Sequence, residues 1–218
     1  MKRALAWLSA STIVVFARLI TAVHARWQGC EPRAVQRIYF ANHCSHGDFV
    51  LLWTVLPAAL RQTTRPVAGS DYWSGSRLKR FIGRDVFRSV LIERNPAQRD
   101  QDPVVQMVQA LDAGDSLIVF PEGTRNTGDT RLLPFKSGLF HLAESRTEVE
   151  LVPVWISNLN RVLPKGEIIP IPLICSVTFG QPLTRIPAEG KAAFLARAEQ
   201  SLLALAMQEA GIDDEKLP

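Results

Sequence analysis

Short strand-like runs alternate with helical patterns along this chain, and this alternation limits the fold more than any other feature. The runs are rich in β-branched and apolar residues and are bounded by turn residues or by charge. They lie at residues 37–41, 89–93, 116–120, 150–156 and 175–179. We expect each to form a buried strand, and strands alternating with helices predict a layered α/β fold.

Apolar residues at helical spacing fall between these runs. One face of a first helix would carry Phe49, Leu52, Trp53, Leu56 and Leu60. A second helix would begin at Pro103, and further helices are expected over residues 134–146 and 188–210. The Pro-rich stretch 164–172 is interpreted as a structured loop. With 218 residues, 47% of them hydrophobic, the chain can bury a core, and no internal linker divides it.

The first residues suggest contact with a membrane. An apolar run from Ala4 to Ala17 is interrupted by Arg18 and resumes at Leu19. It is short for a spanning helix, which needs about 20 apolar residues, and a mid-segment arginine is costly in lipid. We expect residues 1–30 to be a membrane-associated segment whose helix lies in the interface, and residues 31–218 to form the main domain. A secretory signal ending at Val23-His24-Ala25, or a first helix packed on the core, remains open.

Charge and cysteine content limit the partners and the cellular compartment that we expect for this protein. The 25 basic and 21 acidic residues give a net charge of +4, which favours anionic partners such as a membrane surface. A basic stripe with interleaved aromatics is missing, so a nucleic-acid partner is not expected. The three cysteines are scattered along the chain, so neither a disulfide framework nor a zinc ribbon is predicted. A membrane-associated protein facing the reducing cytoplasm fits these features best.

The segment from Asn42 to Asp48 is the first candidate site. It follows a predicted strand and holds two histidines and a carboxylate, His43, His46 and Asp48. An imidazole paired with a carboxylate can deprotonate an alcohol, provided that the chain turns near Ser45 and Gly47 to bring His43 and Asp48 together. Ser45 or Asp48 could instead cap the following helix, which is the alternative interpretation of Asp48.

Two other enzyme chemistries have partial motifs in this sequence. His43, His46 and Asp48 resemble a zinc-hydrolase run, but its spacing fails, because Cys44 and Phe49 stand where histidines belong. A metal-dependent hydrolase is therefore a secondary interpretation, and we predict no metal ligand. Gly114-Asp115-Ser116-Leu117 spells a GDSL nucleophile motif, but no histidine follows His141 to complete it.

The segment from Phe120 to Arg125 is the second candidate site. It follows an apolar strand, and such strand ends commonly hold ligands in layered α/β folds. Gly123 permits close backbone approach, Thr124 adds a hydroxyl, and Arg125 offers a planar fork of donors to a phosphate. The alternative is a strand-ending turn in which a surface Arg125 pairs with Glu122.

Together the two segments resemble the glycerolipid acyltransferases. An Asn-His followed by four residues and then Asp, and a downstream Phe-Pro-Glu-Gly-Thr-Arg, occur in the family's order and separation. Val90-Leu91-Ile92-Glu93-Arg94 and Val152-Pro153-Val154 resemble two further family motifs. The form of the second motif is most similar to the 1-acylglycerol-3-phosphate acyltransferases. Gly69-Ser70-Asp71 departs from a Lys-x-Glu found in many relatives, and Asn126 replaces a frequent serine.

The resemblance implies a layered mixed sheet flanked by helices and a direct acyl transfer without a cofactor. His43 would be the general base, supported by Asp48, and His46 a neighbour. The acceptor phosphate would be bound by Arg94, Glu122, Gly123, Thr124 and Arg125. Lys136 would contact the phosphate or end a solvated helix. The implied partners are membrane lipids, a lysophospholipid acceptor, and acyl-coenzyme A or acyl-carrier protein as donor, with product in phospholipid biosynthesis.

Overall fold

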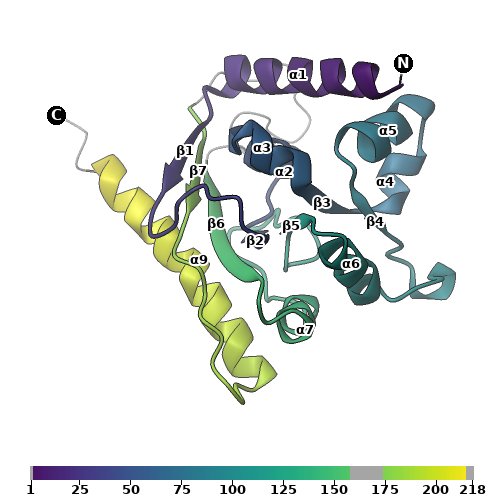
Figure 1. Cartoon of the computed structure of the whole chain (residues 1–218). Helices are drawn as coiled ribbons and strands as arrows, with labels where there is room; N and C mark the ends of the chain where they lie inside the picture. Colours follow the sequence, from purple (N-terminus) through teal and green to yellow (C-terminus); the bar gives the residue numbers. More distant parts are fainter. Residues whose placement is uncertain (1, 158–173, 215–218) are drawn as a thin grey trace.

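A seven-stranded sheet forms the centre of the computed structural model, which describes residues 2–157 and 174–214 (Figure 1). The strand order is β1-β7-β6-β2-β5-β3-β4. The pairs are parallel except β6–β7, which is antiparallel. The strands are β1 (His24–Trp27), β2 (Arg37–Ala41), β3 (Thr64–Gly69), β4 (Val90–Ile92), β5 (Ser116–Val119), β6 (Glu150–Ser157) and β7 (Ser176–Phe179).

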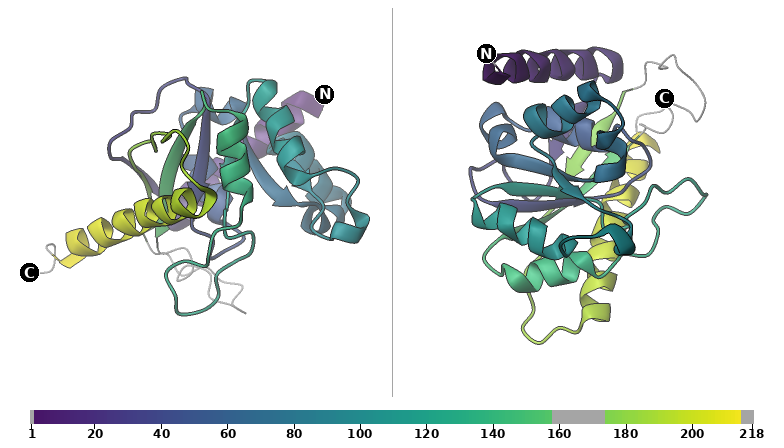
Figure 2. Two further views of the ribbon diagram at one scale, coloured as in Figure 1. Left: turned by 90° about the horizontal axis from the view of Figure 1, so that it is seen from below. Right: turned by 90° about the vertical axis from the view of Figure 1, so that its right-hand side faces the viewer.

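Helices cover both faces of this sheet (Figures 1 and 2). One face is covered by α2 (Asp48–Val55), α3 (Ala58–Thr63), α4 (Ser70–Ser74) and a π-helical turn (Ile82–Val86). Helix α1 (Lys2–Thr21) packs on α2 and the π-helical turn, and α5 (Arg77–Phe81) packs on α4 and the same turn. The other packs against α6 (Pro103–Asp112), α7 (Gly138–Ser145) and α9 (Lys191–Asp214). A 3-10 turn (Pro96–Gln98) precedes α6.

Burial on both faces explains the continuous apolar strands in the sequence. In β2, Ile38 and Phe40 join the core beneath α6, α7 and α9, whereas Tyr39 and Ala41 join the core beneath α1 and α2. Successive side chains of a strand point to opposite faces, so a strand covered on both sides is apolar throughout. The predicted class, a layered mixed α/β sheet flanked by helices, is confirmed.

Several predicted boundaries were wrong for local reasons. The single helix expected over Phe49 to Leu60 is two helices, because Pro57 holds Leu56 in an extended conformation with ψ 140°. The helix expected over residues 134–146 begins only at Gly138, since the backbone N–H of Phe135 donates to Glu199 and that of Lys136 to Pro121. The helix expected over 188–210 begins at Lys191. The loop expected at 164–172 lies outside the described residues.

Strands β1 and β3 were not predicted. Strand β3 contains Pro66, and proline cannot donate a ladder hydrogen bond. The structure accommodates it because Thr64–Pro66 pairs with β5, whereas Val67–Gly69 pairs with β4, so Pro66 lies where β3 changes partner. Strand β1 has only four residues. It lies before the predicted domain division at residue 30, and that division stays a prediction.

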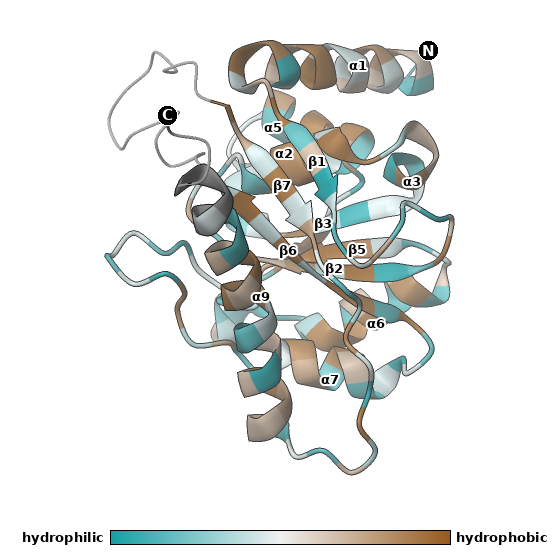
Figure 3. Cartoon of the chain, turned by 90° about the vertical axis from the view of Figure 1, so that its left-hand side faces the viewer, coloured by the Kyte–Doolittle hydropathy of each residue, from teal (hydrophilic) through white to brown (hydrophobic). Residues whose placement is uncertain are grey.

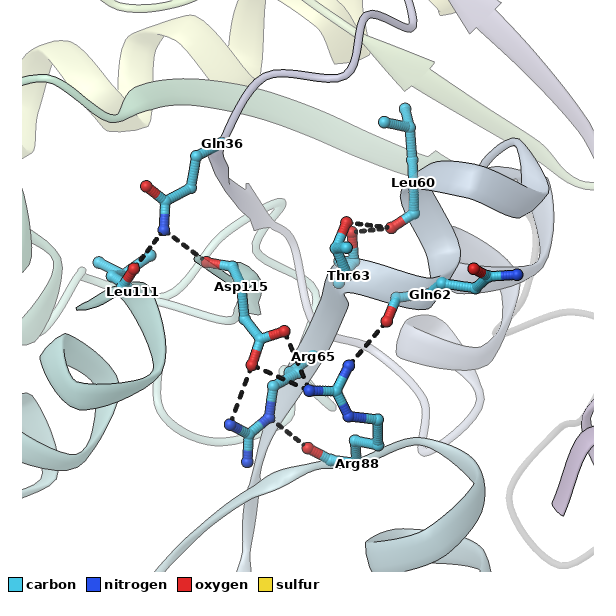
Figure 4. A network of polar contacts seen from close by, with 9 residues as sticks. Gln36, Leu60, Gln62, Thr63, Arg65, Arg88, Leu111 and Asp115 are labelled. Carbon is cyan, nitrogen blue, oxygen red and sulfur yellow. Dashed lines mark hydrogen bonds and ion pairs between the residues drawn. The ribbon is translucent and has the colours of Figure 1, made fainter. Parts of the chain in front are cut away.

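A polar network fixes the amino end of β3 (Figure 4). The buried carboxylate of Asp115 accepts hydrogen bonds from Arg65 and Arg88, and Gln36 donates to the Asp115 backbone carbonyl. Arg88 has a positive φ of 53° and also donates to the Gln62 carbonyl. This network ties β3, β5 and the segment before β4 together at the edge of the sheet opposite the candidate site.

Helix α1 lies along one end of the domain and packs sideways on α2 and the π-helical turn (Figure 2). Its length and composition suffice to cross a membrane, which is weak evidence of membrane association. Several of its large apolar side chains are exposed, among them Phe16 and Leu19. Cleavage at the alternative signal site, after Ala25, would cut within β1.

Candidate active site

The predicted site residues follow the carboxyl ends of four neighbouring parallel strands and therefore lie at one edge of the sheet. Strand β2 leads into the loop with His43, β5 into the loop with Arg125, β3 into Gly69 to Asp71, and β4 into Arg94. The carboxyl ends of parallel strands share an edge, so segments that are distant in sequence meet here. Ligands commonly bind at this edge in α/β sheets.

His43 and Asp48 form the expected pair. The His43 Nδ1 lies 2.9 Å from Asp48 Oδ2, and the same oxygen accepts the backbone N–H groups of Cys44 at 2.7 Å and Ser45 at 2.8 Å. Asp48 is 2% exposed and begins α2, so the loop turns as the pairing requires. With its Nδ1–H donated to Asp48, His43 keeps Nε2 available to a substrate proton.

Two residues of the second motif, Phe120 and Glu122, and the following Asn126 hold the His43 loop in place. Glu122 Oε1 accepts the backbone N–H of His43, and its Oε2 accepts that of Leu133, each at 2.8 Å. The Asn126 N–H donates to the His43 carbonyl, and the Phe120 ring stacks on the His43 ring at 4.2 Å. Glu122 is buried, which raises its pKa against the opposing effect of the two amides. Its oxygens thus support the loop, and it does not pair with Arg125.

Asn42 and the other loop residues have distinct positions. The Asn42 side chain exchanges two hydrogen bonds with the backbone of Ile156 in β6, fixing the end of β2. Burial, aided by the charges of Asp48 and Glu122, raises the pKa of the Cys44 thiol to about 11. Cys44 is therefore a protonated thiol at neutral pH and a poor nucleophile. His46 stacks on Tyr72 with ring centroids 4.9 Å apart, and burial followed by repulsion from Arg125 lowers its pKa.

Two cavities meet at His43. The apolar cavity, of about 240 Å³, lies between the sheet and helices α6 and α7. Arg94 and Lys136 line it next to His43. The rest of the lining is mainly aliphatic and thioether side chains: Val67, Ile92, Met107, Val119, Leu139 and Leu142. It can therefore hold an alkyl chain next to the imidazole.

The polar cavity, of about 280 Å³, lies on the other side of His43. Arg94 and Arg125 line it together with His46, Asp71 and Tyr72. Arg94 Nε lies 3.8 Å from Asp71 Oδ1, and both side chains are more than half exposed. Two guanidinium groups at one cavity suit an anionic group such as a phosphate.

The remaining predicted residues lie around these cavities. Gly123 has a φ of +68°, and a Cβ there would meet the Lys136 side chain at 2.7 Å. Gly123 and Lys136 both line the apolar cavity, and Lys136 precedes α7 in a loop rather than ending a helix. Thr124 is exposed and lines neither cavity, so its predicted contact has no geometric support.

Sequence reasoning missed the residues supplied by β3 and by the helices beside the apolar cavity. Gly69 and Asp71 were noticed only as a departure from the family pattern, and their place in the polar cavity depends on the unpredicted strand β3. A side chain at position 69 would collide with Arg94 and Asp71, since a Cβ there would lie 2.3 Å from Asp71 Oδ1. Met107 and Leu142 carried no signal beyond helical periodicity. Among the described residues no group of three or more His, Cys, Asp or Glu side chains could hold a metal ion.

A family model described as acyltransferase matches residues 28–157, more than half of the chain. The chain belongs to the acyltransferase family. It is 32% identical over 154 residues to a 1-acyl-sn-glycerol-3-phosphate acyltransferase of Limnanthes alba, covering 67% of this chain and 50% of that protein. It is 31% identical over 138 residues to the protein of that name from Escherichia coli, covering 57% and 51%. The chain thus spans about half the length of these curated relatives.

The acyltransferase fold is shared with a solved structure. The crystal structure of the 1-acyl-sn-glycerophosphate (LPA) acyltransferase PlsC from Thermotoga maritima matches with a TM-score of 0.71 and 21% identity. The match covers 95% of this chain and 81% of that one. The family resemblance expected from the two sequence motifs is confirmed.

Proposed function

We propose that this protein transfers an acyl chain from an acyl thioester to the free hydroxyl of a lysophospholipid, with 1-acylglycerol-3-phosphate as the leading acceptor and phosphatidic acid as the product. The observation that carries this proposal is the position of the His43–Asp48 pair where an apolar cavity meets a cavity lined by two arginines. The names of the matched relatives support the same acceptor.

His43 would act as the general base. Its Nε2 removes the proton from the acceptor hydroxyl while Asp48 stabilises the imidazolium. The alkoxide attacks the thioester carbonyl, and the tetrahedral intermediate collapses with the thiolate as leaving group, which takes the proton from His43. Backbone amides near the 122–125 loop would stabilise the oxyanion. Because Cys44 is held as a thiol, a direct transfer without an acyl-enzyme is favoured.

Substrate binding would divide between the two cavities. Arg94 and Arg125 would bind the acceptor's phosphate in the polar cavity, with Glu122, Gly123 and Thr124 shaping the loop. Lys136 would add a positive charge from the adjoining apolar cavity, which it lines. The donor's acyl chain would lie in the apolar cavity along Met107 and Leu142. The donor is a thioester of coenzyme A or of acyl-carrier protein, and no further cofactor is required.

The membrane would supply the acceptor. Helix α1 would rest in the interface at the cytoplasmic face and place the domain beside its lipid substrates in phospholipid biosynthesis. The carboxylate of Asp71 lies beside Arg94 in the polar cavity. A second acceptor class is therefore a lysolipid whose head group carries a positive charge as well as the phosphate. A panel of lysolipids with both donors, followed by mass spectrometry of the products, would identify the pair used.

Substitution of His43 tests the proposal directly. His43→Ala should abolish acceptor-dependent thioester release, because His43 is the only imidazole among the described residues that lines both cavities. His141→Ala is the matched control, since His141 is exposed on α7. Cys44→Ala should retain activity if transfer is direct. Near-normal transfer by a folded His43→Ala protein would show that the general-base assignment is wrong.

A further inference from the structure

A third cavity, which we call the α1 cavity, lies between α1 and the rest of the domain. Its volume is about 500 Å³, within the range of ligand sites. Ala6, Ala10 and Val14 of α1 line one side, and Trp53 and Phe87 line the other. It shares no lining residue with the two cavities at His43. Thr64, at the start of β3, places it toward the sheet edge opposite the candidate active site.

Positive charge borders this apolar space. Arg3, Arg61 and Arg88 line the α1 cavity, against the single carboxylate of Asp85. The charge of Arg88 is offset by its ion pair with Asp115 at 3.1 Å. The charge of Arg61 is not offset, because no carboxylate of the described residues lies within 4.0 Å of it.

Arg61 is held in place beside a second arginine. Its Nη1 donates to the Thr54 carbonyl at 3.4 Å, and its guanidinium lies 5.2 Å from the Trp53 ring centroid. Arg18 of α1 donates to the same Thr54 carbonyl at 3.5 Å. Burial and the nearby charge of Arg18 lower the pKa of Arg61. Two guanidinium groups that converge on one carbonyl keep most of their donors available to an anion.

The position of α1 indicates the source of such an anion. Helix α1 lies at one end of the molecule (Figure 3). Its exposed side chains Leu5, Leu8, Phe16 and Leu19 do not line the α1 cavity, so this end of the molecule suits the interface of a bilayer. A phospholipid combines the two chemistries that the cavity offers, an anionic head for the arginines and an alkyl chain for the apolar walls. A soluble anion would use the first alone.

We propose that the α1 cavity binds one anionic glycerophospholipid, with an acyl chain along Ala10, Val14 and Trp53. Its phosphate would lie at Arg61, which lines the cavity, and at Arg18, which is not a lining residue but shares the Thr54 carbonyl with Arg61. The bound lipid would fill the space under α1 and join that helix to the domain. This site is separate from the proposed reaction, since it needs no turnover and no residue of the His43 loop.

Native mass spectrometry of the full chain in detergent tests this proposal. Phosphatidylglycerol and phosphatidylcholine are added at equal concentration, and the lipid retained per protein is counted. We expect one phosphatidylglycerol to be retained in preference. Arg61→Gln should weaken its retention about tenfold, as expected for loss of a charge-assisted hydrogen bond. Lys2→Gln, which removes an α1 charge outside the cavity, should have little effect.

A second pair of variants keeps every charge. Ala58→Phe places a ring in the α1 cavity and should abolish retention, whereas Ala59→Phe, on an exposed neighbour that does not line it, should not. Near-ultraviolet circular dichroism verifies folding. Equal retention of the two lipids, equal weakening by Arg61→Gln and Lys2→Gln, or unchanged retention in Ala58→Phe would each overturn the proposal.

Discussion

Asp48 combines two functions in one carboxylate oxygen. Oδ2 holds the His43 ring and also accepts the N–H groups of Cys44 and Ser45, so the residue that orients the proposed base also builds its loop. Sequence reasoning treated catalysis and local capping as alternatives for Asp48. The structure does not bear out the capping, because Gly47 precedes α2 without a side-chain cap and Asp48 accepts N–H groups from the loop before the helix. This loop turns around the buried carboxylate and so brings the imidazole to it.

Asp48→Asn separates these functions. An asparagine oxygen can still accept the two backbone N–H groups, but the neutral amide no longer stabilises an imidazolium. We expect kcat to fall on the order of 10²-fold or more, with a smaller change in KM. Steady-state kinetics with Asp100→Asn as an exposed control measures this effect. A folded Asp48→Asn protein with unchanged kcat would contradict the role given to Asp48.

Arg125 and Asp71 should have opposite effects on acceptor binding. Arg125→Ala should raise the KM for a phosphate-bearing acceptor more than it lowers kcat. Asp71→Asn should lower that KM by about two- to fivefold, because an exposed ion pair such as Asp71–Arg94 is worth at most about 1 kcal/mol. Glu148→Gln, at the amino end of β6, removes an acid far from the site. An unchanged KM in Arg125→Ala would remove its phosphate role, and a raised KM in Asp71→Asn would indicate a cationic acceptor group.

Strands with continuous apolar runs could be predicted from the sequence, whereas a strand that changes its pairing partner within the sheet could not. The strands at β2, β5 and β6 followed from uninterrupted apolar runs, and the two motif loops followed from their ends. Strand β3 was missed because Pro66 is tolerated only through a change of partner within the sheet, which depends on contacts distant in sequence. The positions of Gly69 and Asp71 in the site could therefore not be predicted from the sequence. The break between α2 and α3 could have been predicted from Pro57 alone.

Helix α6 should set the preferred acyl length if the apolar cavity holds the donor chain. Met107 is 8% exposed and lines this cavity. Met107→Trp should shift preference toward shorter chains and Met107→Ala toward longer ones, since each buried methylene is worth about 0.8 kcal/mol. Val105→Trp, on the exposed side of α6, is the control. A competition assay with mixed donors measures the shift, and identical preference in all variants would contradict this role for the cavity.

At the scale of the whole molecule, α1 packs one side on the core and leaves several large apolar side chains exposed. Ala17 and Thr21 are buried, while Leu8, Phe16 and Leu19 are 55%, 64% and 78% exposed. Deletion of residues 1–23 should release the protein from membranes, but it would also uncover Trp53 and Phe87. Loss of membrane binding after deletion could thus be confused with misfolding.

Substitution of the exposed side of α1 avoids this ambiguity. Leu8→Ser, Phe16→Ser and Leu19→Ser together keep the buried contacts of α1. The triple variant should release the protein from vesicles, because it removes three apolar side chains that each contribute up to about 1.5–3 kcal/mol on burial in the membrane. Met207→Ser, 67% exposed on α9, should not release it. Sedimentation with vesicles measures binding, and extraction of the wild type at alkaline pH separates a helix in the interface, which is released, from a spanning helix, which is retained. Tight binding by the triple variant would show that another surface holds the membrane.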